Sequence, residues 1–141
     1  MTDQVLGLIG IIRKASALVI GEDRVLESLK RGRVKIMILP LDAGQTARRL
    51  ALSSAEDRHI QTVEIPYTAE VLSHAIGLFN CQIAAVTDLG LAKKLTAVLA
   101  EKNPDRYASA AEAVSRRYDR QERRKRKKPG LWKKKKSAGE E

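Results

Sequence analysis

The chain is organised around residues 18–39, which read LVIGEDRVLESLKRGRVKIMIL. Residues 18–20 are a short apolar run, which predicts a buried strand, and Gly21 can take the positive φ that a tight exit from a strand requires. A helix follows with acidic residues in its first turn, and Gly32 ends it. Residues 36–39 are wholly apolar, as in a central strand buried on both faces. The order strand, turn, helix, strand therefore follows from local pattern alone.

The helix in this stretch has one apolar face and one charged face. Val25, Leu26 and Leu29 are expected to point into the core. The surrounding residues 13–35 hold seven Lys or Arg and three Asp or Glu. A polar helix start that follows a strand and is flanked by cations is a place where backbone N–H groups can meet a phosphate or a base edge. The alternative is a solvated helix face beside a core.

The totals favour one domain with an appendage. The chain has 141 residues, of which 43% are hydrophobic, and this is enough for one core. The single Cys81 excludes an intramolecular disulfide framework and a cysteine-based zinc site. The N-terminus lacks a signal-peptide pattern, and no apolar run is long enough to cross a bilayer. We therefore expect a cytoplasmic protein with no membrane partner.

The formal net charge of +10 is concentrated in the C-terminal part. Residues 1–115 hold 14 Lys or Arg and 13 Asp or Glu, whereas residues 116–136 hold 13 Lys or Arg and two acids. The tail can therefore contact phosphates, although such runs also raise solubility and bind polyanions in general, including DNA. Trp132, between two cationic runs, either stacks on a base or is only exposed to solvent.

Helical and strand patterns alternate along residues 3–102. Helix starts are predicted at Thr2 or Asp3, Thr46, Thr68 and Thr87-Asp88. This alternation predicts an α/β fold, a three-layer α-β-α sandwich around a mixed four-stranded sheet. We expect a domain over 1–104, a basic helical extension over 105–128 and a disordered Lys-rich tail over 129–141. The apolar face expected for the extension consists of Tyr107, Ala111, Val114 and Tyr118.

Motifs of catalysis are missing from the sequence. It has no glycine-rich phosphate loop, no His-Glu pair at helical metal spacing and no nucleophile elbow. His59 and His74 have no nearby partner that would give them acid-base or metal-binding work. We expect no catalytic residues, no cofactor and no metal site.

Two segments together carry a family resemblance: residues 20–27 (IGEDRVLE) with 30–32 (KRG), and residues 72–77 (LSHAIG) followed by 84–86 (AAV). The chain resembles the kink-turn RNA-binding ribosomal protein superfamily, which is shared by archaeal and eukaryotic large-subunit proteins and small bacterial relatives of the YlxQ type. The resemblance covers about residues 3–102. It implies binding to RNA in which a kink exposes tandem sheared G·A pairs.

Carried onto this chain, the family's recognition turn falls on Gly21, Asp23 and the later basic residue Arg31. Arg24 stands where strong binders carry Glu, and Glu27 where they carry Lys, and these two residues have the spacing of an ion pair. The loop after residues 72–77 matches residues that pack on an unstacked base. The residues expected to contact RNA are Lys14, Gly21, Glu22, Asp23, Arg24, Glu27, Arg31, Leu78, Phe79 and Asn80. The residues expected to contact phosphates from the tail are Arg123, Arg124, Lys125, Arg126, Lys127, Lys128, Trp132, Lys133 and Lys134.

Three functions remain open at this point. The first is a non-enzymatic, monomeric protein that binds ribosomal or other structured RNA. The second is a module with degenerate RNA recognition that contacts ribosomal proteins or assembly factors. The third is a domain related to the substrate-binding modules of RNA methyltransferases.

Overall fold

The computed structural model describes residues 3–78 and 81–127. The helices are α1 (Gln4–Lys14), α2 (Glu22–Lys30), α3 (Gln45–Arg58), α4 (Ala69–Ala75), α5 (Leu89–Lys102) and α6 (Pro104–Lys127). The strands are β1 (Leu18–Ile20), β2 (Ile36–Leu39), β3 (Gln61–Glu64) and β4 (Ala84–Val86).

The four strands form one mixed sheet in the order β1-β4-β2-β3. β2 and β3 are parallel, and β4 is antiparallel to both β1 and β2. The sheet therefore has two distinct ends. At the Gly21 end, β1, β2 and β3 finish and β4 begins. At the Lys35 end, β1, β2 and β3 begin and β4 finishes.

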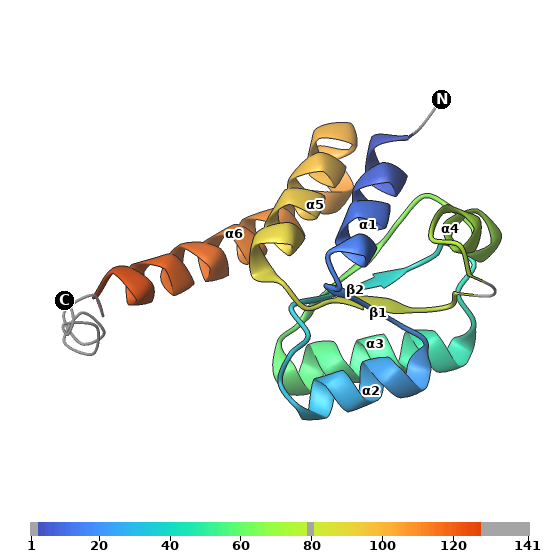
Figure 1. The fold of residues 1–141 in the computed structure, drawn as a ribbon, viewed down its shortest axis with the longest axis horizontal. Coiled ribbons are helices and arrows are strands. Elements are labelled where there is room, and N and C mark those ends of the chain that lie inside the picture. Colours follow the sequence, from blue (N-terminus) through green and yellow to red (C-terminus); the bar gives the residue numbers. More distant parts are fainter. Residues whose placement is uncertain (1–2, 79–80, 128–141) are drawn as a thin grey trace.

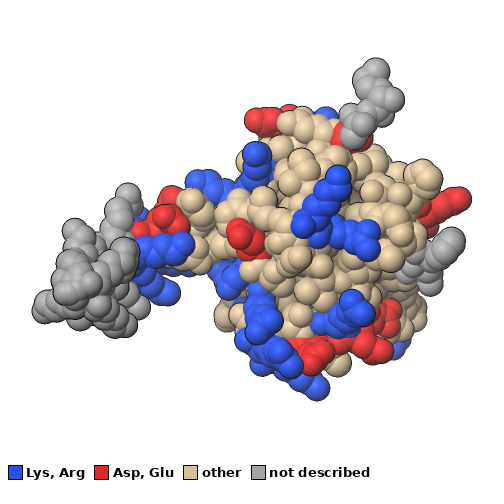
Figure 2. Space-filling model, viewed as in Figure 1, with Lys and Arg blue, Asp and Glu red and all other residues tan. Residues whose placement is uncertain are grey.

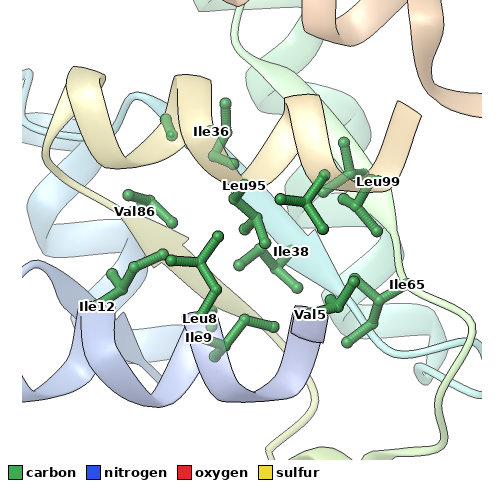
Figure 3. Packing of buried hydrophobic residues seen from close by; sticks show 14 of the residues in the cluster. Val5, Leu8, Ile9, Ile12, Ile36, Ile38, Ile65, Val86, Leu95 and Leu99 are labelled. Atoms are coloured by element: carbon green, nitrogen blue, oxygen red, sulfur yellow. The ribbon is translucent and has the colours of Figure 1, made fainter. Parts of the chain in front are cut away.

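Helices cover both faces of the sheet (Figure 1), which confirms the predicted three-layer α-β-α sandwich. One face packs on α2 and α3, where Val25, Leu29 and Ala47 meet Met37 and Ala85. The other face packs on the remaining helices. Figure 3 shows Val5 and Ile9 of α1 and Leu95 and Leu99 of α5 closing around Ile38. Alternate residues of β2 thus enter opposite cores, as the pleat of a strand dictates.

Three helix starts are confirmed and one is wrong. Asp3, Thr68 and Asp88 accept hydrogen bonds from backbone N–H groups at the starts of α1, α4 and α5. Thr46 is not a cap, because it lies inside α3 and Gly44 is the N-cap residue. The preceding turn already closes with the Ala43 N–H donated to the Pro40 carbonyl at 3.1 Å, so the helix begins earlier than the threonine suggested.

Two apolar helix residues are exposed, and one of them, Leu26, was expected in the core. Leu26 of α2 and Val71 of α4 are each 42% exposed. Val25 and Leu29, four residues apart, define the buried line of α2, and Leu26 lies one residue to the side of it. Apolar content alone did not distinguish these positions from their buried neighbours.

The first half of α6 is part of the main core. Tyr107, Ala110 and Val114 are buried in the same cluster as the residues of α1 and α5. Ala110 takes the buried position that was expected of Ala111, which is only partly covered. The Tyr107 hydroxyl also donates to the backbone carbonyl of Glu64 in β3. Beyond this packed half, α6 projects away from the body of the molecule (Figure 1).

Candidate nucleic-acid interface

Gly21 forms a sharp turn between β1 and α2. Its φ is +98° and its ψ is 151°, a conformation open essentially to glycine alone. Its carbonyl accepts the first hydrogen bond of α2, from the N–H of Val25 at 2.9 Å. No described side chain caps α2, so the N–H groups of its first turn are available to a ligand. Glu22 and Asp23 lie in that turn, and Asp23 is exposed.

The loop before β4 lies beside this turn. The Gly21 N–H donates to the Ile83 carbonyl at 3.0 Å, and Ile20 pairs with Ala84 across the two strands. Leu78 is held by its N–H, which donates to the Ser73 carbonyl at 2.9 Å, yet its side chain is 37% exposed. Phe79 and Asn80 lie outside the described residues. The two segments that carry the resemblance therefore meet at the Gly21 end of the sheet (Figure 1).

Helix α4 is tied to α1 just before this loop. The Arg13 guanidinium donates to the Ile76 carbonyl at the C-terminus of α4. Ser73 in the same helix accepts the N–H of Cys81 through its hydroxyl, at 2.7 Å. These hydrogen bonds hold the chain on both sides of positions 79 and 80.

The charged face of α2 differs from expectation in one pairing. Glu27 forms an ion pair with Arg31 at 3.1 Å, so the expected pairing of Glu27 with Arg24 is wrong. The i, i+4 geometry brings Glu27 and Arg31 together on adjacent turns. Arg24 is exposed and has no ion pair among the described residues. A shallow hollow of about 280 Å³ is lined by Arg24, Glu27, Arg31 and Arg33, three cations and one acid.

The remaining predicted contacts lie elsewhere. Lys14 is in the last turn of α1, four residues before β1 begins, whereas Gly21 follows that strand. Arg123, Arg124 and Lys125 are exposed on the projecting end of α6, on the opposite side of the molecule from the Gly21 end (Figure 1). Arg126 and Lys127 form the end of that helix. Lys128, Trp132, Lys133 and Lys134 lie outside the described residues. The Gly21 turn and the basic helix are therefore two separate surfaces.

A second group of cations lies at the Lys35 end of the sheet, and the sequence reasoning missed all of them except Arg124. We call it the arginine groove, and its cations are Lys35, Arg58, Arg116, Arg117, Arg120 and Arg124. Figure 2 shows blue side chains gathering where α6 leaves the body of the molecule. Arg116, Arg120 and Arg124 are spaced four residues apart, and this spacing could have predicted that they share one face of a helix. The proximity of Lys35 and Arg58 to that face could not be predicted, because it depends on how β2 and β3 pair.

Another hollow lies beside α4 and the start of the Leu78 loop. It measures about 510 Å³ and is lined by Asp42, Glu70, Ser73, His74 and Leu78, among others. No group of three or more potential metal ligands occurs in residues 3–78 and 81–127. Burial raises the pKa of the nearby Cys81 thiol to about 11, which favours the protonated form. Over the same residues, no helix combines the length and apolar character needed to cross a membrane.

The fold is that of a small α/β protein in which two segments distant in sequence converge at one end of the sheet. No protein-family model matches the chain. The chain is similar to RNA-binding protein YlxQ of Bacillus subtilis (strain 168), with 29% identity over 92 residues, which are 65% of this chain and 91% of that protein. This similarity confirms the predicted resemblance to bacterial proteins of the YlxQ type.

Solved structures agree at the level of the fold. A protein with unknown function from Bacillus halodurans C has a TM-score of 0.63 and 28% identity, covering 68% of this chain and 96% of its own. The 15.5kD RNA binding protein of Giardia lamblia has a TM-score of 0.55 and 17% identity, covering 81% of this chain and 92% of its own. The second likeness shows a shared fold.

Proposed function

We propose that this chain is a non-enzymatic RNA-binding protein that engages structured RNA through the Gly21 turn and the loop that begins at Leu78. The hydrogen bond from the Gly21 N–H to the Ile83 carbonyl carries the proposal, because it brings together two segments more than fifty residues apart. The similarity to a protein named RNA-binding protein YlxQ supports the same function.

The chemistry of this end suits a kinked RNA. Unpaired backbone N–H groups at the start of α2 can donate to base edges, and the exposed Asp23 carboxylate can accept from the amino groups of guanine or adenine. Leu78 offers an apolar surface to an unstacked base. Arg24 and Arg31 can neutralise phosphates that flank the kink. We assign tandem sheared G·A pairs as the target of this surface.

Replacement of Leu78 by Ala tests the contact with an unstacked base. We expect Leu78→Ala to weaken binding to a kinked RNA duplex about fivefold, or about 1 kcal/mol, through loss of apolar contact. Leu52→Ala is the matched control, because Leu52 is 64% exposed on α3, away from the site. Equal affinities for the two variants would argue against this loop as a binding element.

An interaction module with degenerate RNA recognition is the second candidate. The observation that favours it is the ion pair between Glu27 and Arg31, which occupies the basic side chain that the family would use on RNA. A double variant, Gly21→Ala with Leu78→Ala, separates the two functions. Ribosome association that survives in this variant, while binding to kinked RNA is lost, would favour a protein partner.

We propose that the RNA is ribosomal, that the protein acts in the cytoplasm as a monomer, and that it uses no cofactor. We also propose that the surface that recognises the kink lies within residues 1–104 and that the basic extension adds affinity without sequence preference. A sedimentation measurement of the chain with and without RNA tests the stoichiometry.

A further inference from the structure

The arginine groove is a composite surface that needs the folded chain. It comprises two adjoining hollows of about 320 and 420 Å³, and both are lined by Arg117 and Arg120. The first adds Lys35 and Arg124, and the second adds Arg58 and His59. α6, the C-terminus of α3 and the entry to β2 all contribute. No carboxylate is present among the described residues that line either hollow.

Arg117 fixes the geometry of the groove. Its guanidinium donates to the Lys35 carbonyl at 3.2 Å, and the Lys35 N–H donates to the Val86 carbonyl at 2.8 Å. α6 is therefore held against the Lys35 end of the sheet. Burial, and then the neighbouring charge of Arg120, lower the pKa of Arg117. The guanidinium groups of Arg117 and Arg120 thus lie close enough to repel each other.

The positive charge of the groove is only slightly compensated. Arg116 pairs with Glu112 at 3.2 Å across exposed side chains. Lys35, Arg58, Arg120 and Arg124 have no ion pair with any described residue. Asp88 and Glu122 line an adjoining hollow that also includes Lys35. Like charges held together with few acids nearby raise the energy of the folded state, and a bound polyanion would relieve this repulsion.

The position and length of the groove indicate which polyanion it fits. From Arg116 to Arg124 the helix rises about 12 Å, a length over which duplex DNA carries about seven phosphates. The four residues of β2 separate this end of the sheet from the Gly21 end by about 13 Å. A nucleic acid that touches both ends must therefore extend along the molecule beyond the kink.

We propose that the arginine groove binds the phosphodiester backbone of a duplex arm of the same RNA that the Gly21 turn recognises. This inference rests on the proposed function. It adds a second contact with the RNA, one that does not depend on the shape of the kink. The groove supplies affinity and salt dependence, whereas the Gly21 end supplies preference for the kink. An RNA with a full-length arm occupies both surfaces at once.

The test compares two full-length double variants that each lose two positive charges. Arg58→Gln with Arg120→Gln removes charge from the groove, whereas Arg49→Gln with Lys94→Gln removes it from exposed positions that line neither hollow. The probe is a kinked RNA duplex, titrated by fluorescence anisotropy over a range of KCl concentrations. We expect the groove variant to bind about tenfold more weakly, with a salt slope smaller by about 1.5. The control should change the slope by less than about 0.5.

The outcomes separate this inference from the proposed function. Equal changes in the two double variants would overturn the groove and leave RNA binding intact, whereas failure of the wild-type chain to bind the RNA would overturn both. On an RNA with its arms cut back to the pairs beside the kink, the groove variant and the wild type should bind alike. A difference there would overturn the assignment to a duplex arm. If the groove double variant fails to fold, Arg124→Gln compared with Lys94→Gln should show a slope smaller by about 0.8.

Discussion

Val114 tests whether α6 is an integral part of the folded unit or an appendage to a domain that is complete by residue 104. Its side chain is 0% exposed and belongs to the cluster that also contains Leu95 and Leu99. Val114→Ala removes two carbon groups from this core, which costs about 1.6 kcal/mol in transfer free energy. Incomplete closure of the resulting cavity adds up to about 1 kcal/mol.

The matched control is Val71→Ala, the same change at a helical position that is 42% exposed. Both substitutions gain the same small helix propensity, about 0.5 kcal/mol, so the difference between them isolates burial. Val71 is more than half covered, so its own substitution costs about 0.9 kcal/mol in transfer free energy. We expect the free energy of unfolding of Val114→Ala to be lower than that of Val71→Ala by about 0.7 to 1.7 kcal/mol. With an unfolding entropy of about 2.1 cal/mol/K per residue, this corresponds to a Tm lower by about 2 to 6 °C.

The assay is urea unfolding of the two variants and the wild type, followed by far-ultraviolet circular dichroism and cross-checked by thermal unfolding. A difference of less than about 0.5 kcal/mol between the variants would refute the reasoning. It would mean that α6 adds little to the core and that residues 1–104 are self-sufficient. A large difference would show that truncation at residue 104 exposes the core, so binding experiments should keep the helix.

Three further predictions follow from local geometry. Gly21→Ala should lower the free energy of unfolding by about 1 to 3 kcal/mol, because the φ of +98° strains any residue with a Cβ even though no atom crowds that Cβ. Gly10→Ala, inside helix α1, should instead raise the free energy of unfolding by about 0.5 to 1 kcal/mol. Equal effects of the two substitutions in urea unfolding would contradict backbone strain at Gly21. The hydrogen bond from Arg48, and then that from Arg106, lowers the pKa of Glu64 in the folded protein. The stabilisation from these ion pairs is therefore present above pH 4.5, the ordinary pKa of the carboxyl, and is lost as the pH falls through the lower pKa of the folded state. The wild type should therefore exceed Glu64→Gln by about 0.5 to 1 kcal/mol at pH 7 and lose that advantage at low pH; a constant difference across that range would count against the ion pairs. Cys81, which is 1% exposed with a pKa of about 11, should react with a thiol reagent only in denaturant, and rapid labelling of the native protein would contradict its burial.

Much of the fold was predictable because its signals are local. The apolar run of β2 between Lys35 and Pro40 identified a central strand, and positive φ at Gly21 followed from the sharp change from strand to helix. The alternation of helices and strands then left a layered α/β sandwich as the expected architecture. These features depend on the spacing of residues along the chain, which the sequence shows directly.

Features that depend on long-range pairing could not be predicted in the same way. Placement of β4 between β1 and β2 brings Ile83 beside Gly21, and no local pattern encodes that order. Val114 was expected on the apolar face of the extension, but its place in the main core follows from packing of α6 on α5, which no local pattern shows. The meeting of Arg58 with Arg120 likewise requires the tertiary structure.

The two segments of the candidate site were predicted from the sequence, whereas one ion pair within the site was not. Gly21 and Leu78 were chosen on resemblance, and the structure places their segments at one end of the sheet. The pairing of Glu27 with Arg31 instead of Arg24 was missed, because two basic partners lay within one helical turn of the same carboxylate. The roles of these residues on RNA stay predictions.

Recognition of RNA shape by the Gly21 end is tested most directly by one titration. The full chain is titrated against a kinked RNA duplex and against the same duplex with its G·A pairs replaced by Watson–Crick pairs, at a salt concentration that weakens the contacts of the basic helix. The account predicts a preference of at least about tenfold, or about 1.4 kcal/mol, for the kinked duplex. Equal affinity for the two duplexes would contradict it.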